Sequence, residues 1–176
     1  MSLTNVILPD KLQTIEIGAF AYCKALKSIH IPLSVSHIGY SVFDSCIELE
    51  TITIDKNNKN YHVINNCLIE KSTKTMLATG YSNNIIPDTD SVKILGRGLF
   101  SGHKNLTAIN IPENITAIEA YAFSECTSLS SISMSANIEI IGEFAFKDCA
   151  SLTAIDLPNS LTEIERNTFL GCSSIN

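Results

Sequence analysis

The sequence predicts a solenoid of the α/β superhelix class, in which short repeated units stack along one axis. Leucines that open similar segments recur every 23 residues, at Leu3, Leu26 and Leu49 and again at Leu106, Leu129 and Leu152. Each of the five prolines follows a leucine or an isoleucine, in the pairs Leu8-Pro9, Ile31-Pro32, Ile86-Pro87, Ile111-Pro112 and Leu157-Pro158. A fixed period of this length is typical of repeat proteins, whose units pack mainly against their neighbours.

The composition is that of a globular chain. Of the 176 residues, 45% are apolar and 17% are charged, a profile too apolar for intrinsic disorder. A chain of this length can bury a core without disulfides or metal. The net charge is −6 and the only arginines are Arg97 and Arg166, so a basic surface for nucleic acid is not expected. The apolar runs are far shorter than the roughly 20 residues that span a bilayer, which argues against direct membrane insertion.

The period divides the chain into seven units, with Ile175 and Asn176 as the start of an eighth. The units are 3–25, 26–48, 49–80, 81–105, 106–128, 129–151 and 152–174. Neither end shows the polar capping unit that usually covers the terminal core of a solenoid. We therefore expect either a piece of a longer array or ends that associate with other molecules, including end-to-end self-association. The first residues carry no secretory signal peptide.

Each regular unit is expected to contain one strand and one short helical turn. In the unit 26–48, for example, Ile29 and Ile31 alternate with polar residues and Pro32 ends the pattern. Such alternation predicts a strand, and stacked units would build a parallel concave sheet with strands about 4.8 Å apart. The segment Ala-Phe-x-x-Cys spaces Phe20 and Cys23 three residues apart, which favours an inward-facing turn of α or 3₁₀ helix on the convex side.

The unit 49–80 is longer than its neighbours and irregular. Its segments 61–70 and 75–78 are rich in strand-forming residues, and the polar stretch 71–74 separates them. This arrangement predicts one β-hairpin insertion that interrupts the array without ending it.

Five of the six cysteines recur at the period. They are Cys23, Cys46, Cys126, Cys149 and Cys172, and a shared position in the unit directs their side chains the same way. Parallel Cβ vectors suit a disulfide poorly, so we expect buried free thiols. Cys67 lies off this register and is the candidate for a reactive thiol, while His103 occupies the cysteine position of its unit as a partly buried substitute.

The repeated pattern Leu-x-x-Ile-x-Ile-Pro-x-x-Val/Ile-x-x-Ile-Gly/Glu-x-x-Ala-Phe-x-x-Cys resembles the BspA-type leucine-rich repeat family over nearly the whole chain. The unit 26–48 shows it well, while Glu16, Glu119 and Glu165 stand where glycine is frequent. The resemblance implies a curved leucine-rich-repeat solenoid with a parallel concave sheet. It also implies a cell-surface or secreted protein, since family members are mostly surface proteins, several of them linked to adhesion to host matrix proteins or to other cells.

Outward residues of the predicted strands are the candidate ligand-binding residues, because solenoids bind partners through their regular concave face. The side chains are small, mostly hydroxylated and lightly charged, and they could hydrogen-bond an extended peptide or a glycan. The alternative is a solvated sheet with good β propensity and no ligand. The candidates are Lys27, His30, Glu50, Thr51, Thr53, Thr107, Asn110, Ser131, Ser133 and Asp156.

No residue pattern indicates an enzyme, a cofactor or a metal site. Lys27, His30 and Glu50 form a charged cluster without an activated nucleophile. The other histidines occupy different positions of their units and cannot converge on one metal ion. Two functions stay open: a non-enzymatic module of a surface adhesin that binds a protein, such as host extracellular matrix, or a glycan, and an intracellular scaffold or structural repeat protein.

Overall fold

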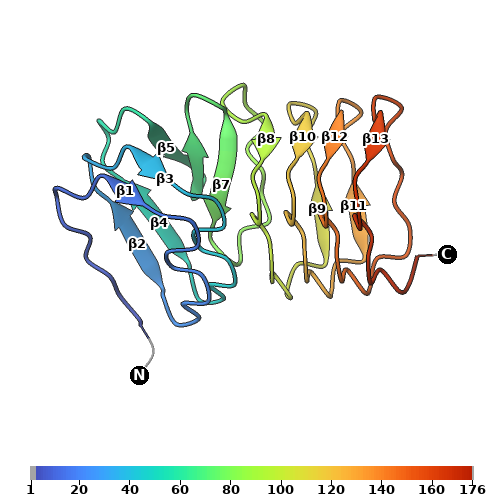
Figure 1. The fold of residues 1–176 in the computed structure, drawn as a ribbon, viewed down its shortest axis with the longest axis horizontal. Coiled ribbons are helices and arrows are strands. Elements are labelled where there is room, and N and C mark those ends of the chain that lie inside the picture. Colours follow the sequence, from blue (N-terminus) through green and yellow to red (C-terminus); the bar gives the residue numbers. More distant parts are fainter. Residues whose placement is uncertain (1–2, 176) are drawn as a thin grey trace.

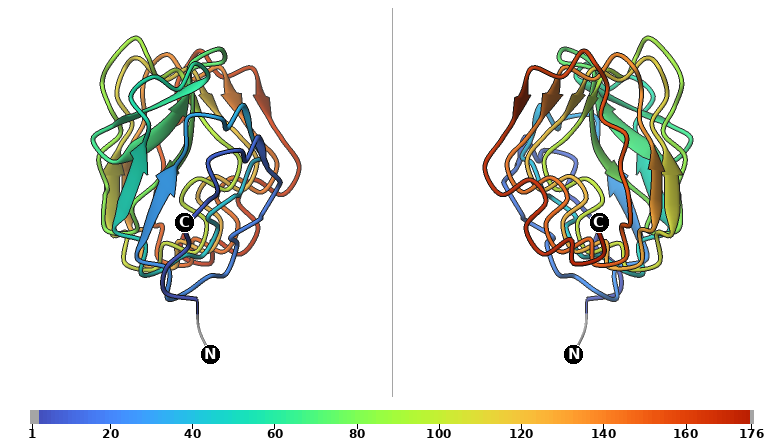
Figure 2. Two further views of the ribbon diagram at one scale, coloured as in Figure 1. Left: turned by 90° about the vertical axis from the view of Figure 1, so that its left-hand side faces the viewer. Right: turned by 90° about the vertical axis from the view of Figure 1, so that its right-hand side faces the viewer.

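A computed structural model describes residues 3–175, which form a stack of coils that runs from left to right along the long axis of the molecule in Figure 1. The described residues contain 13 strands and no helix. Most coils contribute to two sheet faces and one turn segment, and the end-on views show the two sets of strands on different sides of the coil (Figure 2). The fold is therefore the predicted parallel solenoid, built with turns in place of helices.

The first sheet face contains the strands that the sequence predicts. It comprises β2 (Ser28–Ile31), β4 (Thr51–Ile54), β9 (Ala108–Asn110) and β11 (Ser131–Ser133). β2 pairs with β4 and β9 with β11, both in parallel and both with partners 23 residues apart, as in Ser28↔Thr51. The segment 82–86 forms no strand, so the face is interrupted between β4 and β9.

The second sheet face was not predicted. It holds the two-residue strands β1 (Thr14–Ile15), β3 (His37–Ile38), β8 (Ile94–Leu95), β10 (Ala117–Ile118), β12 (Ile140–Ile141) and β13 (Glu163–Ile164). Their second residues mostly point inward, as the buried Ile118 and Ile141 do, whereas Ile140 points to solvent. These strands pair in parallel with those of neighbouring coils.

The expected helical turns are wrong. Two residues of each turn segment have positive φ, for example Tyr121 at 60° and Glu125 at 60°. Left-handed residues at this spacing cannot continue a right-handed helix. The Phe123 N–H therefore bonds to the Ala145 carbonyl of the next coil at 2.8 Å, while the Ser124 N–H bonds back to Tyr121 at 3.0 Å. Half of the turn's donors thus hold neighbouring coils together.

The long unit forms the predicted hairpin and one additional strand. β5 (Tyr61–Ile64), β6 (Cys67–Glu70) and β7 (Thr75–Thr79) are antiparallel, and β7 then pairs in parallel with β8. Asn65 and Asn66, with φ of 49° and 64°, make the tight turn between β5 and β6. Because the insertion supplies no turn segment, Ser41 N–H donates directly to the Arg97 carbonyl at 3.3 Å.

The core consists of side-chain ladders that follow the sequence period. The Phe123 ring stacks between Phe100 at 5.1 Å and Phe146 at 5.2 Å. The thiol of Cys126 donates to the Phe100 carbonyl at 3.1 Å, and the thiol of Cys149 donates to the Phe123 carbonyl at 3.2 Å. All six cysteines are free; of the five periodic ones, Cys46, Cys126 and Cys149 are buried as expected, whereas Cys23 and Cys172 are only partly buried.

Two residues outside the regular pattern are also buried. Cys67 is 0% exposed and burial raises the pKa of its thiol, so the hypothesis of a reactive Cys67 is wrong. His103 is buried beside Tyr81 and Phe100, with ring centroids 4.7 and 5.5 Å away, as expected for a cysteine substitute. Burial lowers the pKa of His103 to about 4.

Candidate functional site

All ten candidate residues predicted from the sequence are exposed on the first sheet face or beside it. The interruption of that face divides them into two groups. The first group, on or next to β2 and β4, is Lys27, His30, Glu50, Thr51 and Thr53. The second group, on or next to β9 and β11 and in the following coil, is Thr107, Asn110, Ser131, Ser133 and Asp156, of which Thr107 precedes β9 and Asp156 lies outside any strand.

Side chains of the first group are partly engaged with one another. His30 Nδ1 lies 3.0 Å from Thr53 Oγ1, and its Nε2 lies 3.8 Å from a carboxylate oxygen of Asp55. The same Asp55 oxygen accepts the Leu33 N–H at 2.7 Å. These contacts fix the imidazole of His30 on the surface.

The second group leaves its polar atoms free. Asn110 and Ser133 are opposite one another on the paired strands β9 and β11. Within residues 3–175, neither the Asn110 amide nor the Ser133 hydroxyl hydrogen-bonds to the protein. These groups are available to an external donor or acceptor.

A polar cleft of about 580 Å³ lies at the interruption of the first face. Its lining residues are Glu50, Asn65, Asn66, Gly80, Ser82, Asn83 and Ile85. The Asn66 amide accepts the Ile52 N–H at 2.7 Å and donates to the Glu50 carbonyl at 2.7 Å, so it replaces the missing neighbour of β4. Glu50 is the one residue of the ten candidates that lines this cleft. Asn65 and Asn66 were missed, although this pair is itself a signal for a tight hairpin turn.

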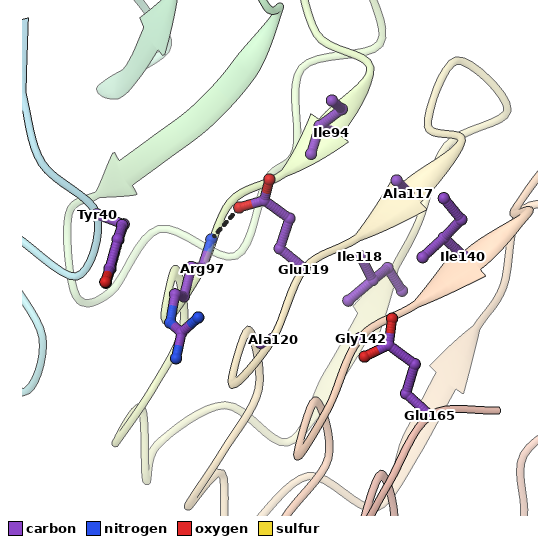
Figure 3. A pocket seen from close by; sticks show the side chains of 10 residues that line it. All are labelled: Tyr40, Ile94, Arg97, Ala117, Ile118, Glu119, Ala120, Ile140, Gly142 and Glu165. Carbon is purple, nitrogen blue, oxygen red and sulfur yellow. Dashed lines mark hydrogen bonds between the residues drawn. The ribbon is translucent and has the colours of Figure 1, made fainter.

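A groove of about 500 Å³ lies on the second sheet face, away from every predicted residue. Its floor includes Ile94, Ala117 and Ile140, and Figure 3 shows Tyr40 and Arg97 near one end, with Glu119 and Glu165 along the strands. A sequence signal could have indicated this groove. Glu119 and Glu165 each follow the second residue of a strand of the second face, at a position where other units have glycine.

Comparison with known families identifies the chain. The model of the BspA-type leucine-rich repeat region matches residues 1–83 and 75–176, with six copies of the repeat. The chain belongs to the BspA-type leucine-rich repeat family. No protein with a curated description matches it.

Solved structures of leucine-rich repeat proteins share the fold. A leucine-rich cell surface protein from Faecalibacterium prausnitzii A2-165 is 31% identical with a TM-score of 0.80, over 95% of this chain and 45% of that protein. The pneumococcal vaccine antigen PcpA is 22% identical with a TM-score of 0.75, over 86% of this chain and 38% of PcpA. A leucine-rich repeat protein from Eubacterium ventriosum ATCC 27560 is 24% identical with a TM-score of 0.53, over 96% of this chain and 64% of that protein. The chain thus spans less than half the length of the first two.

Two further findings concern the described part of the chain. Residues 3–175 contain no cluster of three or more histidine, cysteine, aspartate or glutamate side chains suited to a metal ion. The same residues include no helix with the length and apolar character needed to cross a membrane.

Proposed function

We propose that this chain is a non-enzymatic binding module of a cell-surface protein and that it recognises a protein or glycan ligand through the first sheet face. One observation carries the proposal: all ten predicted polar side chains are exposed, and those on β2, β4, β9 and β11 alternate with isoleucines that face the core. A further support is that polar atoms of Asn110 and Ser133 are not used within the described residues.

The spacing of this face suits an extended ligand. Neighbouring strands lie about 4.8 Å apart, and alternate residues of one strand lie roughly 6.7 Å apart. An extended peptide repeats its own side chains at a similar distance, so its polar groups can meet those of successive coils. The polar cleft between the two groups adds asparagine amides and the Glu50 carboxylate, which can bind the hydroxyl groups of a glycan equally well.

The proposed location rests on a relative. The leucine-rich protein from Faecalibacterium prausnitzii, with 31% identity, is described as a cell surface protein. A protein displayed on a surface meets the matrix proteins and glycans of other cells, which are the partners we propose for this chain.

The test measures binding of the purified chain to immobilised extracellular-matrix proteins and to a glycan array. Ser133→Lys and Thr53→Lys place a long cationic side chain on each half of the first face. Thr127→Lys introduces the same charge at an exposed position of a turn segment and serves as the matched control. We expect at least one probe to bind the wild type and the control, and binding to fall at least tenfold in one of the two face variants. Failure of every probe to bind, or equal binding by all variants, would contradict the proposal.

A further inference from the structure

The groove on the second sheet face has an apolar floor. Ile94, Ala117 and Ile140 are aligned in register on the neighbouring strands β8, β10 and β12. Ile140 is 53% exposed, which is unusual for an isoleucine in the middle of a sheet. The small Ala117 between two isoleucines leaves a hollow in which an apolar side chain can be buried (Figure 3).

The groove also holds an unused backbone donor. In two places a glutamate of the next coil accepts a backbone N–H: Glu119 accepts that of Arg97 at 2.8 Å, and Glu165 accepts that of Glu143 at 2.9 Å. In the coil between them the equivalent residue is Gly142. The Ala120 N–H therefore has no acceptor among the described residues, and a Cβ at Gly142 would lie only 2.5 Å from the Ala120 nitrogen.

The charge of the groove is negative. Glu119 and Glu165 line it, and each uses only one carboxylate oxygen for a backbone N–H. The one cation in the lining is Arg97, whose guanidinium lies against the rings of Tyr40 at 4.9 Å and Tyr121 at 5.2 Å. Two carboxylates against one guanidinium leave an excess of negative charge that a cationic group would neutralise.

We propose that this groove is a docking site for an extended peptide segment of a partner protein that carries a lysine or arginine beside apolar residues. The peptide carbonyl would accept the Ala120 N–H, an apolar side chain would cover Ala117, and the basic side chain would pair with Glu119 and Glu165. A neutral glycan could use the same hydrogen-bonding groups but would leave the excess charge unpaired. This site is separate from the first face, so it does not depend on the proposed function.

The test is a fluorescence anisotropy titration with labelled synthetic peptides. The probe is acetyl-Ile-Lys-Val-Lys-Ile-amide, and the matched probes carry glutamate or glutamine in place of both lysines; a neutral oligosaccharide, maltotetraose, is titrated as competitor. We expect the lysine peptide to bind at least tenfold more tightly than the other two peptides. Its affinity is expected to weaken with added salt, because the attraction is electrostatic.

Variants locate the binding on the molecule. The double variant Glu119→Gln/Glu165→Gln removes both charges, while the glutamine carbonyl can still accept the backbone N–H groups. Glu48→Gln/Glu125→Gln removes two charges at exposed positions outside the groove. We expect a tenfold loss of lysine-peptide affinity in the first double variant and none in the second, with equal melting temperatures. Equal affinity in both variants, no preference for the lysine peptide, or displacement by maltotetraose would each overturn the proposal.

Discussion

Replacing Phe123 with alanine is the sharpest test of the ring ladder that we describe. The Phe123 side chain is fully buried and stacks on two neighbouring rings, with interplanar angles of 9° to Phe100 and 1° to Phe146. Its replacement removes a large apolar side chain from the centre of the stack and leaves a cavity that neighbouring coils cannot close without breaking their hydrogen bonds. The ladder thus predicts a loss of stability that depends on position along the array.

The magnitude follows from burial and from the number of ring partners. Burying a phenylalanine in a core is worth about 3–5 kcal/mol relative to alanine, and a fully buried ring with two stacked partners belongs at the upper end of that range. Phe169 is only partly buried and stacks on one ring, Phe146, at 5.6 Å. We expect Phe169→Ala to cost about 2 kcal/mol. The exposed Thr107→Ala is expected to stay within about 0.5 kcal/mol of the wild type.

The assay is urea unfolding followed by far-ultraviolet circular dichroism. The free energy of unfolding is compared among the three variants and the wild type, provided that its dependence on urea concentration has the same slope in all four proteins. The ladder predicts the order Phe123→Ala, Phe169→Ala, Thr107→Ala from most to least destabilised. Equal losses for Phe123→Ala and Thr107→Ala would refute the assignment of Phe123 to the core ladder.

Three further predictions concern polar groups at the insertion and in the core. The Tyr61 hydroxyl accepts the buried Ile38 N–H at 2.8 Å, so Tyr61→Phe should lower the free energy of unfolding in urea by about 1–3 kcal/mol. The Tyr81 hydroxyl accepts the exposed Lys104 N–H, so the control Tyr81→Phe should lower it less, and equal losses would contradict this role of Tyr61. Asn66→Gly keeps the left-handed turn but removes both bonds to the edge of β4, so it should destabilise the protein by about 1–3 kcal/mol, whereas Asn65→Gly, whose side chain makes no such bonds, should not. Burial lowers the pKa of His103 from 6.5 to about 4 despite the nearby Asp44 carboxylate, so as the pH falls from 6.5 to 4 the unfolded chain gains a proton that the folded chain does not. The free energy of unfolding should therefore fall by about 3 kcal/mol over this window in the wild type and not in His103→Cys. Identical pH profiles of the two proteins would show that His103 is not buried as a neutral imidazole.

The parts of the fold that repeat could be predicted from the sequence. Ile29 and Ile31 alternate with exposed residues as a half-buried strand requires, and Phe123 lies in a ladder because its position recurs in each regular unit. The same period identified ten exposed candidates, six of which lie on the strands of the first face. The hairpin followed from a polar stretch between two strand-forming segments.

Features that depend on contacts between coils could not be predicted. The spacing of Phe20 and Cys23 fits a helical turn and also fits the observed turn, whose N–H groups bond to the next coil. Positive φ at Tyr121 or Glu125 has no signal in residue type, since neither is a glycine. The groove depends on Gly142 facing Ala120 in a neighbouring coil, and on the insertion that brings the segment of Tyr40 beside that of Arg97.

We propose above that this chain is a binding module displayed at a cell surface. The most direct measurement is antibody labelling of intact cells that naturally express the chain, using an antibody against residues 3–175, with permeabilised cells as the control. We expect intact cells to be labelled. Labelling that is seen only after permeabilisation would contradict it.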